Sequence, residues 1–237
     1  MGKNLIQQAR GRGGPTYRAP SFNYVGAAKH RKEIKDKVKG IVKELLHCPG
    51  HSAPLARIAY EDGESCLLIA PEGIKQGDSV SYNIEEISPA NTLHLKDIPE
   101  GTLIYNVESV PGDGGKFARA SGTFAKILAK SSQRIVIQLP SKKQKDFNPS
   151  CRANIGIVAA GGRPDKPFLK AGVRHFRMKA KNKLYPSISG TSQNAVDHPF
   201  GTSRSSKKGH PTIAPKNAPP GKNVGKIRPS RTGWRRK

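Results

Sequence analysis

The sequence predicts an all-β fold in the middle of the chain, with long basic irregular extensions at both termini. Short apolar runs in the middle are separated by turn residues about every eight to twelve positions, a spacing typical of small barrels or a sandwich. The two ends are rich in Gly, Pro and basic residues and poor in core-forming residues. We therefore predict four segments: a basic N-terminal extension at 1–34, two β units at 35–85 and 86–170, and a basic C-terminal extension at 171–237.

The first strand is expected from Val38 onward. The run "IKDKVKGIVKELLH" also fits a helix, because its apolar residues recur with helical spacing. Gly40 in the middle of the run and Pro49-Gly50 after it favour a strand.

Two hairpins are expected further along the chain. "ARIAYEDG" and "ESCLLIAPEG" are apolar runs joined by Asp-Gly, which predicts the first hairpin. "GDSVSYNIEEI" and "NTLHLKDIPEGTLIYNVESV" continue the strand pattern, and "GTFAKILAKSSQRIVIQLPSKKQ" predicts the second hairpin. In that hairpin the sequence alternates with period two, as in a strand with one buried and one exposed face. The residues Ile135, Ile137 and Leu139 alternate with Arg134, Val136 and Gln138.

The charge distribution predicts a polyanionic partner. The formal net charge is +25. Its parts are +6 in residues 1–34, −2 in 35–85, +6 in 86–170 and +15 in 171–237. Nucleic acid is the first candidate, because basic residues that meet phosphates release condensed counterions. An anionic membrane surface is the second, but no apolar run approaches the roughly 18 residues that span a bilayer.

Three widely spaced cysteines, Cys48, Cys66 and Cys151, argue against a disulfide framework. We therefore expect a reducing, cytoplasmic setting without membrane association.

The segment "VPGDGGKFARASG", residues 110–122, is the most specific candidate site in the middle of the chain. Its glycines permit positive φ and a close approach of backbone N–H groups to phosphates, with Lys116 and Arg119 beside them. A tight turn between strands explains the same glycines. The segment lacks the Gly-Lys-Ser/Thr ending of a nucleotide-binding loop.

An Asp–His pair, Asp197 and His198, invites a catalytic interpretation. Adjacent residues in an extended chain point in opposite directions, and Pro199 keeps His198 out of helical space. No nucleophile motif lies nearby. A structural histidine, or one held against RNA, therefore fits better than a catalytic dyad.

The cluster "HCPGH" holds three residues that bind metals, His47, Cys48 and His51. No second Cys/His pair has zinc spacing, so we expect a turn after a strand and no metal site.

Few aromatic residues are present, with a single Trp. A sheet that stacks unpaired bases would carry more of them. Recognition of structured RNA through phosphate, 2′-OH and shape is the expected mode.

Several blocks in order along the chain resemble one family. They are "SAPLARIAYEDGE", "LIAPEGI", "PGDGGKFARASGT", "CRANIGIVAAGGRPDKPFLKAG", "NAVDHPFG" and "GHPTIAPKNAPPGKNVGKIRPSRTG". They are similar to the signature of the universal large-subunit ribosomal protein L2 family, in its archaeal and eukaryotic branch.

The resemblance implies an OB-fold barrel followed by an SH3-like barrel, with both extensions threaded into ribosomal RNA. It implies primary binding to large-subunit ribosomal RNA near the peptidyl transferase centre and a part in subunit association. Asp197, His198 and Pro199 match the family's loop nearest that centre, where RNA performs catalysis. Gly114, Lys116 and Arg119 match an RNA-facing loop between the barrels.

We therefore expect a structural constituent of the large ribosomal subunit, and not an enzyme. Its partners would be large-subunit ribosomal RNA, neighbouring ribosomal proteins and the small subunit across the interface. It would have no cofactor, with structural Mg²⁺ shared with the RNA left open. A non-ribosomal RNA-binding translation or transcription factor, and an enzyme using His198, are the alternatives. The expected RNA-binding residues are Arg10, Arg12, Arg18, Lys116, Arg119, Arg174, Lys179, Lys181, Asp197, His198, Pro199, Arg204, Lys207, Lys208, Arg231, Arg235 and Arg236.

Overall fold

A computed structural model of the chain describes residues 11–32, 37–84, 86–189, 192–194, 196–197 and 201. Contacts divide the chain into two units. One unit is Ser21–Lys170, and the other combines Met1–Pro20 with Ala171–Lys237.

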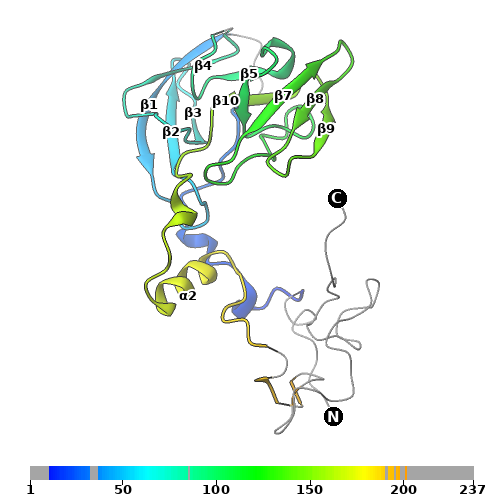
Figure 1. The fold of residues 1–237 in the computed structure, drawn as a ribbon. Coiled ribbons are helices and arrows are strands. Elements are labelled where there is room, and N and C mark those ends of the chain that lie inside the picture. The colour runs from blue at the N-terminus through cyan, green and yellow to red at the C-terminus, as the bar shows by residue number, and fades with distance from the viewer. Residues whose placement is uncertain are drawn as a thin grey trace. The chain divides into compact units, whose positions relative to one another are not determined.

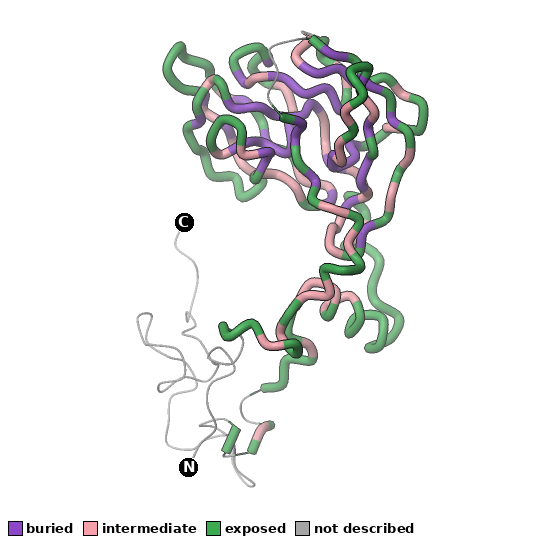
Figure 2. The backbone as a smooth tube through the Cα atoms, turned by 180° about the vertical axis from the view of Figure 1, so that it is seen from behind, coloured by how far each residue is buried: buried purple, intermediate pink, exposed green. Residues whose placement is uncertain are grey.

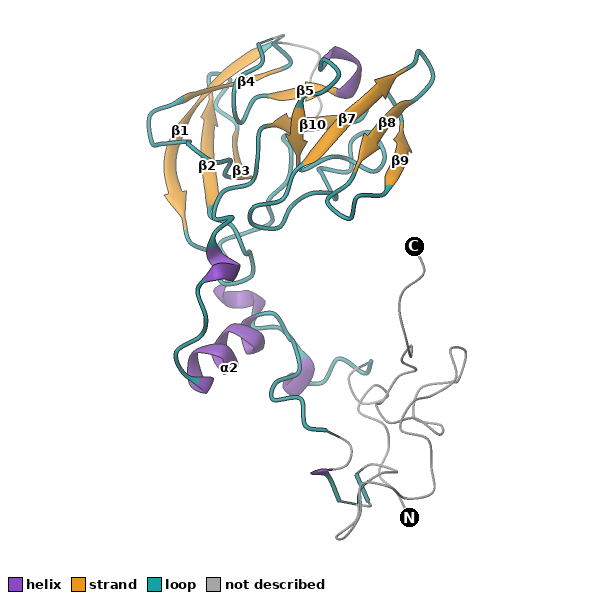
Figure 3. Cartoon of the chain, in the orientation of Figure 1, coloured by secondary structure: helices purple, strands orange, loops and turns teal. Residues whose placement is uncertain are grey.

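The unit Ser21–Lys170 contains all ten strands of the described residues (Figures 1 and 3). They are β1 Val38–Leu46, β2 Leu55–Tyr60, β3 Ser65–Ile69, β4 Ser79–Tyr82, β5 Thr92–His94, β6 Leu103–Tyr105, β7 Ala125–Lys130, β8 Ile135–Gln138, β9 Gln144–Phe147 and β10 Arg152–Ile155. Short 3₁₀ turns are η1 Pro15–Tyr17, η2 Ser21–Asn23, η3 Leu95–Asp97 and η4 Arg163–Asp165.

The strands pair in the order β3-β2-β1-β4-β5-β10-β6-β7-β8-β9. All pairs are antiparallel except β4 with β5, which meet through Tyr82 and Thr92 and join the first four strands to the remaining six. The all-β class is confirmed. Among the described residues β3 and β9 are edge strands, so the paired strands form an open sheet and not a closed barrel.

The choice of a strand from Val38 is confirmed. β1 alternates buried and exposed residues from Val38 onward, as a strand with one face on a core does. Close packing explains why position 40 is a glycine, because a Cβ added there would lie 2.8 Å from a ring carbon of Tyr60.

Both expected hairpins are confirmed. β2 and β3 pair antiparallel from Leu55 with Ile69 to Ala59 with Ser65. β7 and β8 pair likewise, and Ile135 is buried there, as is Ile137 in the alternating pattern. Figure 2 shows buried residues along the strands of this unit.

Three apolar clusters form the core. One lies among β1 to β4 and a second among β5 to β10. The third brings Leu55 and Ile69 together with Tyr105 and Val158, and includes Ala28 from the N-terminal segment. Part of the segment expected as an extension is thus packed into the β unit. The four segment boundaries stay predictions.

The helix α2, Ala171–Ala180, was not expected, since residues 171–237 were predicted to be irregular. Gly and Pro are frequent over the whole of that segment, but its first fifteen residues contain one Gly and no Pro. Ala, Arg, Met and Lys there are good helix formers. No helix among the described residues is long and apolar enough to cross a membrane.

Candidate nucleic-acid interface

The Gly-rich segment after β6 is a tight loop that requires glycine. Gly112, Gly114 and Gly115 have φ of 82°, 81° and 95°, in the left-handed region. A Cβ on Gly115 would also lie 2.3 Å from Oδ1 of Asn106. Both the conformation and the close packing therefore exclude larger residues at this position.

Two carboxylates hold the loop from inside. Asp113 accepts hydrogen bonds from the amides of Ser109, Val110 and Gly115 at 3.0 to 3.2 Å. Burial alone would raise the pKa of Asp113, but these hydrogen bonds outweigh it and hold the pKa below its usual range.

Glu108 holds the other side of the loop. Its carboxylate accepts from the amides of Gly112 at 3.3 Å and Gly114 at 3.1 Å. Together the two carboxylates occupy five backbone amides between Ser109 and Gly115. The glycines thus serve a tight turn, and these five amides are not open to phosphate.

The side chains of Lys116 and Arg119 differ in availability. The side chain of Lys116 is 62% exposed, and its ammonium lies 3.5 Å from the carboxylate of Asp113 at the surface of the loop. Arg119 is half-buried and donates to the carbonyl oxygens of Gly115 at 2.8 Å and Ala28 at 2.6 Å. Burial lowers the pKa of Arg119. Arg119 therefore ties the N-terminal segment to the loop, and Lys116 is the group placed to meet a phosphate.

A buried ion pair lies behind the loop. Arg152 on β10 donates to Glu108 through Nη2 at 2.7 Å and through its own amide at 2.8 Å. Its Nη1 donates to the carbonyl oxygen of Arg31 at 2.9 Å and to the hydroxyl of Tyr82 at 3.0 Å. Burial would raise the pKa of Glu108, but the hydrogen bonds from Arg152 lower it below its usual value.

The N-terminal segment is held by two further side chains. His30 is buried with Nε2 2.7 Å from the carbonyl oxygen of Asn106. The pKa of His30 is lowered to about 4, mainly by burial and also by the charge of Arg152. The hydrogen bond to Asn106 acts in the opposite direction but is outweighed. The ring is therefore neutral at neutral pH and donates from Nε2.

Arg31 continues this anchor. Its guanidinium lies over the rings of Tyr60 and Tyr82, at 4.4 and 5.3 Å from their centroids. It pairs with Asp62 and, at 2.9 Å, with Glu64. Arg31 is thus engaged inside the protein.

Sequence reasoning missed His30, Arg31, Glu108 and Arg152. The only signal was indirect: a Glu and an Arg in strongly apolar, strand-forming surroundings require buried partners.

The expected basic residues outside the β unit are partly described. Arg12 and Arg18 are exposed in the N-terminal segment, as are Arg174 and Lys179 in α2, and Lys181 is half-exposed after it. The guanidinium of Arg174 lies 5.1 Å from the ring centroid of Tyr185. Nine expected residues lie outside the described residues: Arg10, His198, Pro199, Arg204, Lys207, Lys208, Arg231, Arg235 and Arg236.

Asp197 is exposed, and its amide donates to the carbonyl oxygen of Asn194 at 2.9 Å. This contact forms a turn just before His198.

The "HCPGH" turn is confirmed. The amide of His51 donates to the carbonyl oxygen of Cys48 at 3.1 Å, directly after β1. Nδ1 of His51 also lies 3.1 Å from Sγ of the buried Cys48.

An all-β unit with an exposed lysine on an internally braced loop, flanked by basic segments, is typical of a nucleic-acid-binding protein. Two family models match the chain: "Ribosomal Proteins L2, RNA binding N-terminal domain" at residues 3–82, and "Ribosomal Proteins L2, C-terminal domain" at residues 88–220. The chain belongs to the ribosomal protein L2 family, which confirms the resemblance drawn from its motifs.

Curated relatives cover nearly the whole chain. The Methanopyrus kandleri protein is 49% identical over 98% of this chain and 98% of its own length. The Haloarcula marismortui protein is 49% identical with the same coverage, and the Methanococcoides burtonii protein is 47% identical over 99% of this chain and 100% of its own length. Each is named large ribosomal subunit protein uL2.

Proposed function

We propose that this chain is a structural constituent of the large ribosomal subunit that binds ribosomal RNA. The observation that carries the proposal is the match to the L2 family along nearly the entire chain, 3–82 and 88–220. This is a family of ribosomal structural proteins and not of enzymes, and no observation favours the alternative of an enzyme using His198.

The charge distribution supplies a physical mechanism. The β unit is braced from inside by Glu108 and Arg152, so it offers RNA a rigid base. The segments 1–34 and 171–237, with net charges of +6 and +15, would neutralise phosphates that otherwise repel one another. RNA strands could then pack closely around the protein. Arg would be preferred where a guanidinium makes two hydrogen bonds to one phosphate.

The finer parts of the proposal concern position. We propose primary binding near the peptidyl transferase centre, neighbouring ribosomal proteins as further partners, and support for association with the small subunit. The protein would work within cytoplasmic ribosomes. The role requires no cofactor of its own, and structural Mg²⁺ would be shared with RNA.

Sedimentation tests the proposal. Tagged protein expressed in an archaeal host should co-sediment with large subunits in a sucrose gradient and stay with them after a high-salt wash. Protein that remains at the top of the gradient, with a pool bound to other RNAs, would instead favour the non-ribosomal factor.

A further inference from the structure

The hairpin of β8 and β9 carries three exposed lysines, Lys142, Lys143 and Lys145. Among the described residues, no ion pair joins any of them to a carboxylate. The acid on β9, Asp146, pairs with Arg134 at 3.1 Å across the hairpin. Within the described part of the chain, the three positive charges therefore have no ion-pair partner. The hairpin that carries them ends in β9, an edge strand of the sheet (Figure 1).

The backbone at the hairpin tip is unfavourable for the residue that occupies it. The amide of Lys142 donates to the carbonyl oxygen of Leu139 at 2.8 Å. The amide of Leu139 donates to the carbonyl oxygen of Lys143 at 2.9 Å. This closes a three-residue loop whose last position, Lys142, has φ of 64°. Gly or Asn normally fills that position, because side chains crowd the backbone there. Folding alone does not select a lysine at this point, and such strain gathers at functional sites.

Lys145 connects the hairpin to the Gly-rich loop. Its ammonium lies 4.5 Å from the ring centroid of Phe117 and 5.3 Å from that of Phe147. The two rings pack edge to face at 5.3 Å. Lys116, the exposed lysine of the loop, directly precedes Phe117. Lys145 therefore lies beside the residue that follows Lys116, and exposed lysines occur in the loop, on β9 and at the hairpin tip.

A row of polar side chains lies on the other face of the hairpin, because Gln144 is next to Lys145 in sequence and successive residues of a strand point to opposite faces. Lys126 on β7 pairs with Gln138 on β8, which pairs with Gln144 on β9. Residues opposite one another on paired strands share a face, and none of the three is buried. Amide side chains of this kind hydrogen-bond phosphate and ribose hydroxyl groups.

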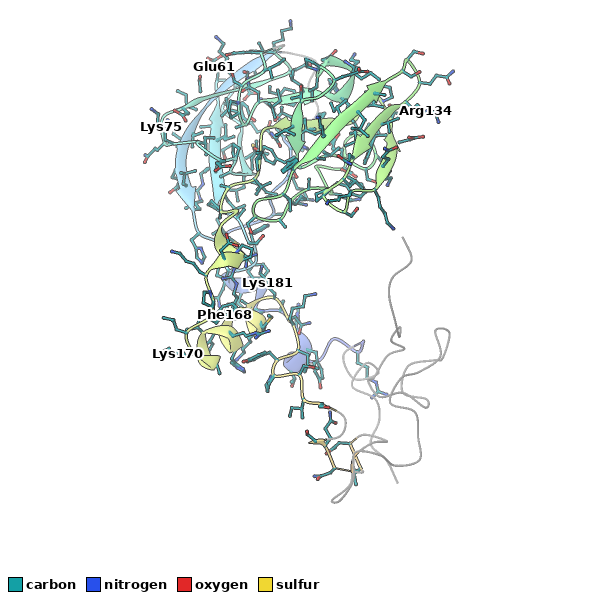
Figure 4. The ribbon with its side chains drawn as sticks, viewed as in Figure 1. Glu61, Lys75, Arg134, Phe168, Lys170 and Lys181 are labelled. Carbon is teal, nitrogen blue, oxygen red and sulfur yellow. The ribbon has the colours of Figure 1, made fainter. Side chains whose placement is uncertain are left out.

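The far end of the sheet provides the contrast. Residues 35–85 carry a net charge of −2, and the exposed lysines Lys39, Lys43 and Lys75 lie on that part of the unit. Figure 4 labels Lys75 on the side of the unit opposite Arg134 of the β7–β8 turn. Basic residues are thus present at both ends, but only one end has them in excess.

We propose that the β8–β9 hairpin, through Lys142, Lys143 and Lys145, binds the phosphate backbone of ribosomal RNA and extends the surface that begins at Lys116. This inference rests on the proposed function and adds a contact surface that sequence motifs did not indicate.

Salt-dependent binding to a transcript of archaeal large-subunit ribosomal RNA tests the proposal with full-length protein. The hairpin variant Lys142→Gln/Lys143→Gln/Lys145→Gln removes three charges from the proposed surface. The control variant Lys39→Gln/Lys43→Gln/Lys75→Gln removes three charges from the far end. The hairpin variant should reduce the slope of log K against log salt by about 2 to 3, and the control variant should leave it unchanged.

A single substitution separates binding from folding. Lys142→Gly removes one charge and relieves the left-handed backbone, so Tm should be equal or higher by up to about 4 °C, while the salt slope should fall by about 1. A sharp fall in Tm, or an unchanged slope, would overturn the argument from the hairpin tip.

The outcomes also separate this inference from the function on which it rests. Wild-type protein that fails to bind the transcript overturns the proposed function. Wild-type binding that the hairpin and control variants weaken equally overturns the hairpin surface alone.

Discussion

Arg152 donates to one oxygen of Glu108 from both Nη2, at 2.7 Å, and Nε, at 3.1 Å. The two side chains are 3% and 0% exposed. Arg152 also donates through Nη1 to the carbonyl oxygen of Arg31 and to the hydroxyl of Tyr82. Glu108 also accepts a hydrogen bond from the amide of Gly114. This pair therefore joins β10, the N-terminal segment and the Gly-rich loop, and it keeps Lys116 on a fixed support.

Glu108→Gln should destabilise the protein strongly. The substitution keeps the shape of the side chain but leaves the guanidinium of Arg152 buried without a counter-charge, which costs about 3 to 5 kcal/mol. The free energy of unfolding from urea denaturation measures the loss.

A matched control lies on the surface. Glu44 pairs with Arg57, and both side chains are more than 40% exposed. Glu44→Gln should cost less than about 1 kcal/mol, because solvent screens the pair. Equal losses in Glu44→Gln and Glu108→Gln would contradict the role assigned to the buried pair.

Acid should weaken the fold through His30. Its pKa is about 4 in the folded protein against 6.5 in the unfolded chain, so the unfolded chain binds more protons between these values. The stabilisation is complete above pH 6.5 and is lost as the pH falls toward 4, by about 3 kcal/mol. The charges of Arg152, Arg119 and Glu108 act on the same ring.

His30→Gln isolates this contribution. The variant keeps a donor toward Asn106 but has no titrating group. The difference in unfolding free energy between wild type and variant should shrink as the pH is lowered from 6.5 to 4. Glu108, whose pKa is lowered in the fold, also contributes stability that acid removes, but it is common to both proteins. A constant difference over this range would show that His30 does not titrate as expected.

The local parts of the fold were predictable because their signals are local. Gly40 and Pro49-Gly50 predicted the strand β1, and turn residues between apolar runs predicted both hairpins, with a period-two alternation in the second. The helix α2 was missed because composition was averaged over a long segment, although its first residues lack the Gly and Pro that follow.

The support of the site was not predictable, because it depends on distant residues. Glu108 and Arg152 are 44 positions apart, and His30 and Asn106 are 76 apart. The motif around Lys116 and Arg119 indicated a tight glycine-rich loop but could not show that Arg119 is used to hold Ala28. Those partners become neighbours only through the packing of the strands.

Two glycines of the loop should respond differently to alanine. At Gly115 the added Cβ would meet both Oδ1 of Asn106, at 2.3 Å, and its carbonyl oxygen, at 2.7 Å, in a left-handed backbone. Gly115→Ala should therefore cost more than about 3 kcal/mol, from strain and overpacking together. Gly112 has φ of 82° but no atom within 4 Å of an added Cβ, so Gly112→Ala should cost only about 1 to 2 kcal/mol. Urea denaturation of both variants checks the difference, and equal losses would refute the packing argument.

Deleting residues 204–237 should weaken RNA binding without unfolding the β unit. The deleted segment contains eleven Lys and Arg residues and no Asp or Glu. Each contact between a basic residue and phosphate contributes about 0.7 to 0.9 to the slope of log K against log salt, so the truncated protein should show a much flatter slope. The core clusters lie within residues 28–158, so the Tm of the free protein should stay unchanged. Filter binding from about 0.05 to 0.2 M salt measures the slope. A truncated protein with the slope of the full chain would show that these residues do not meet phosphate.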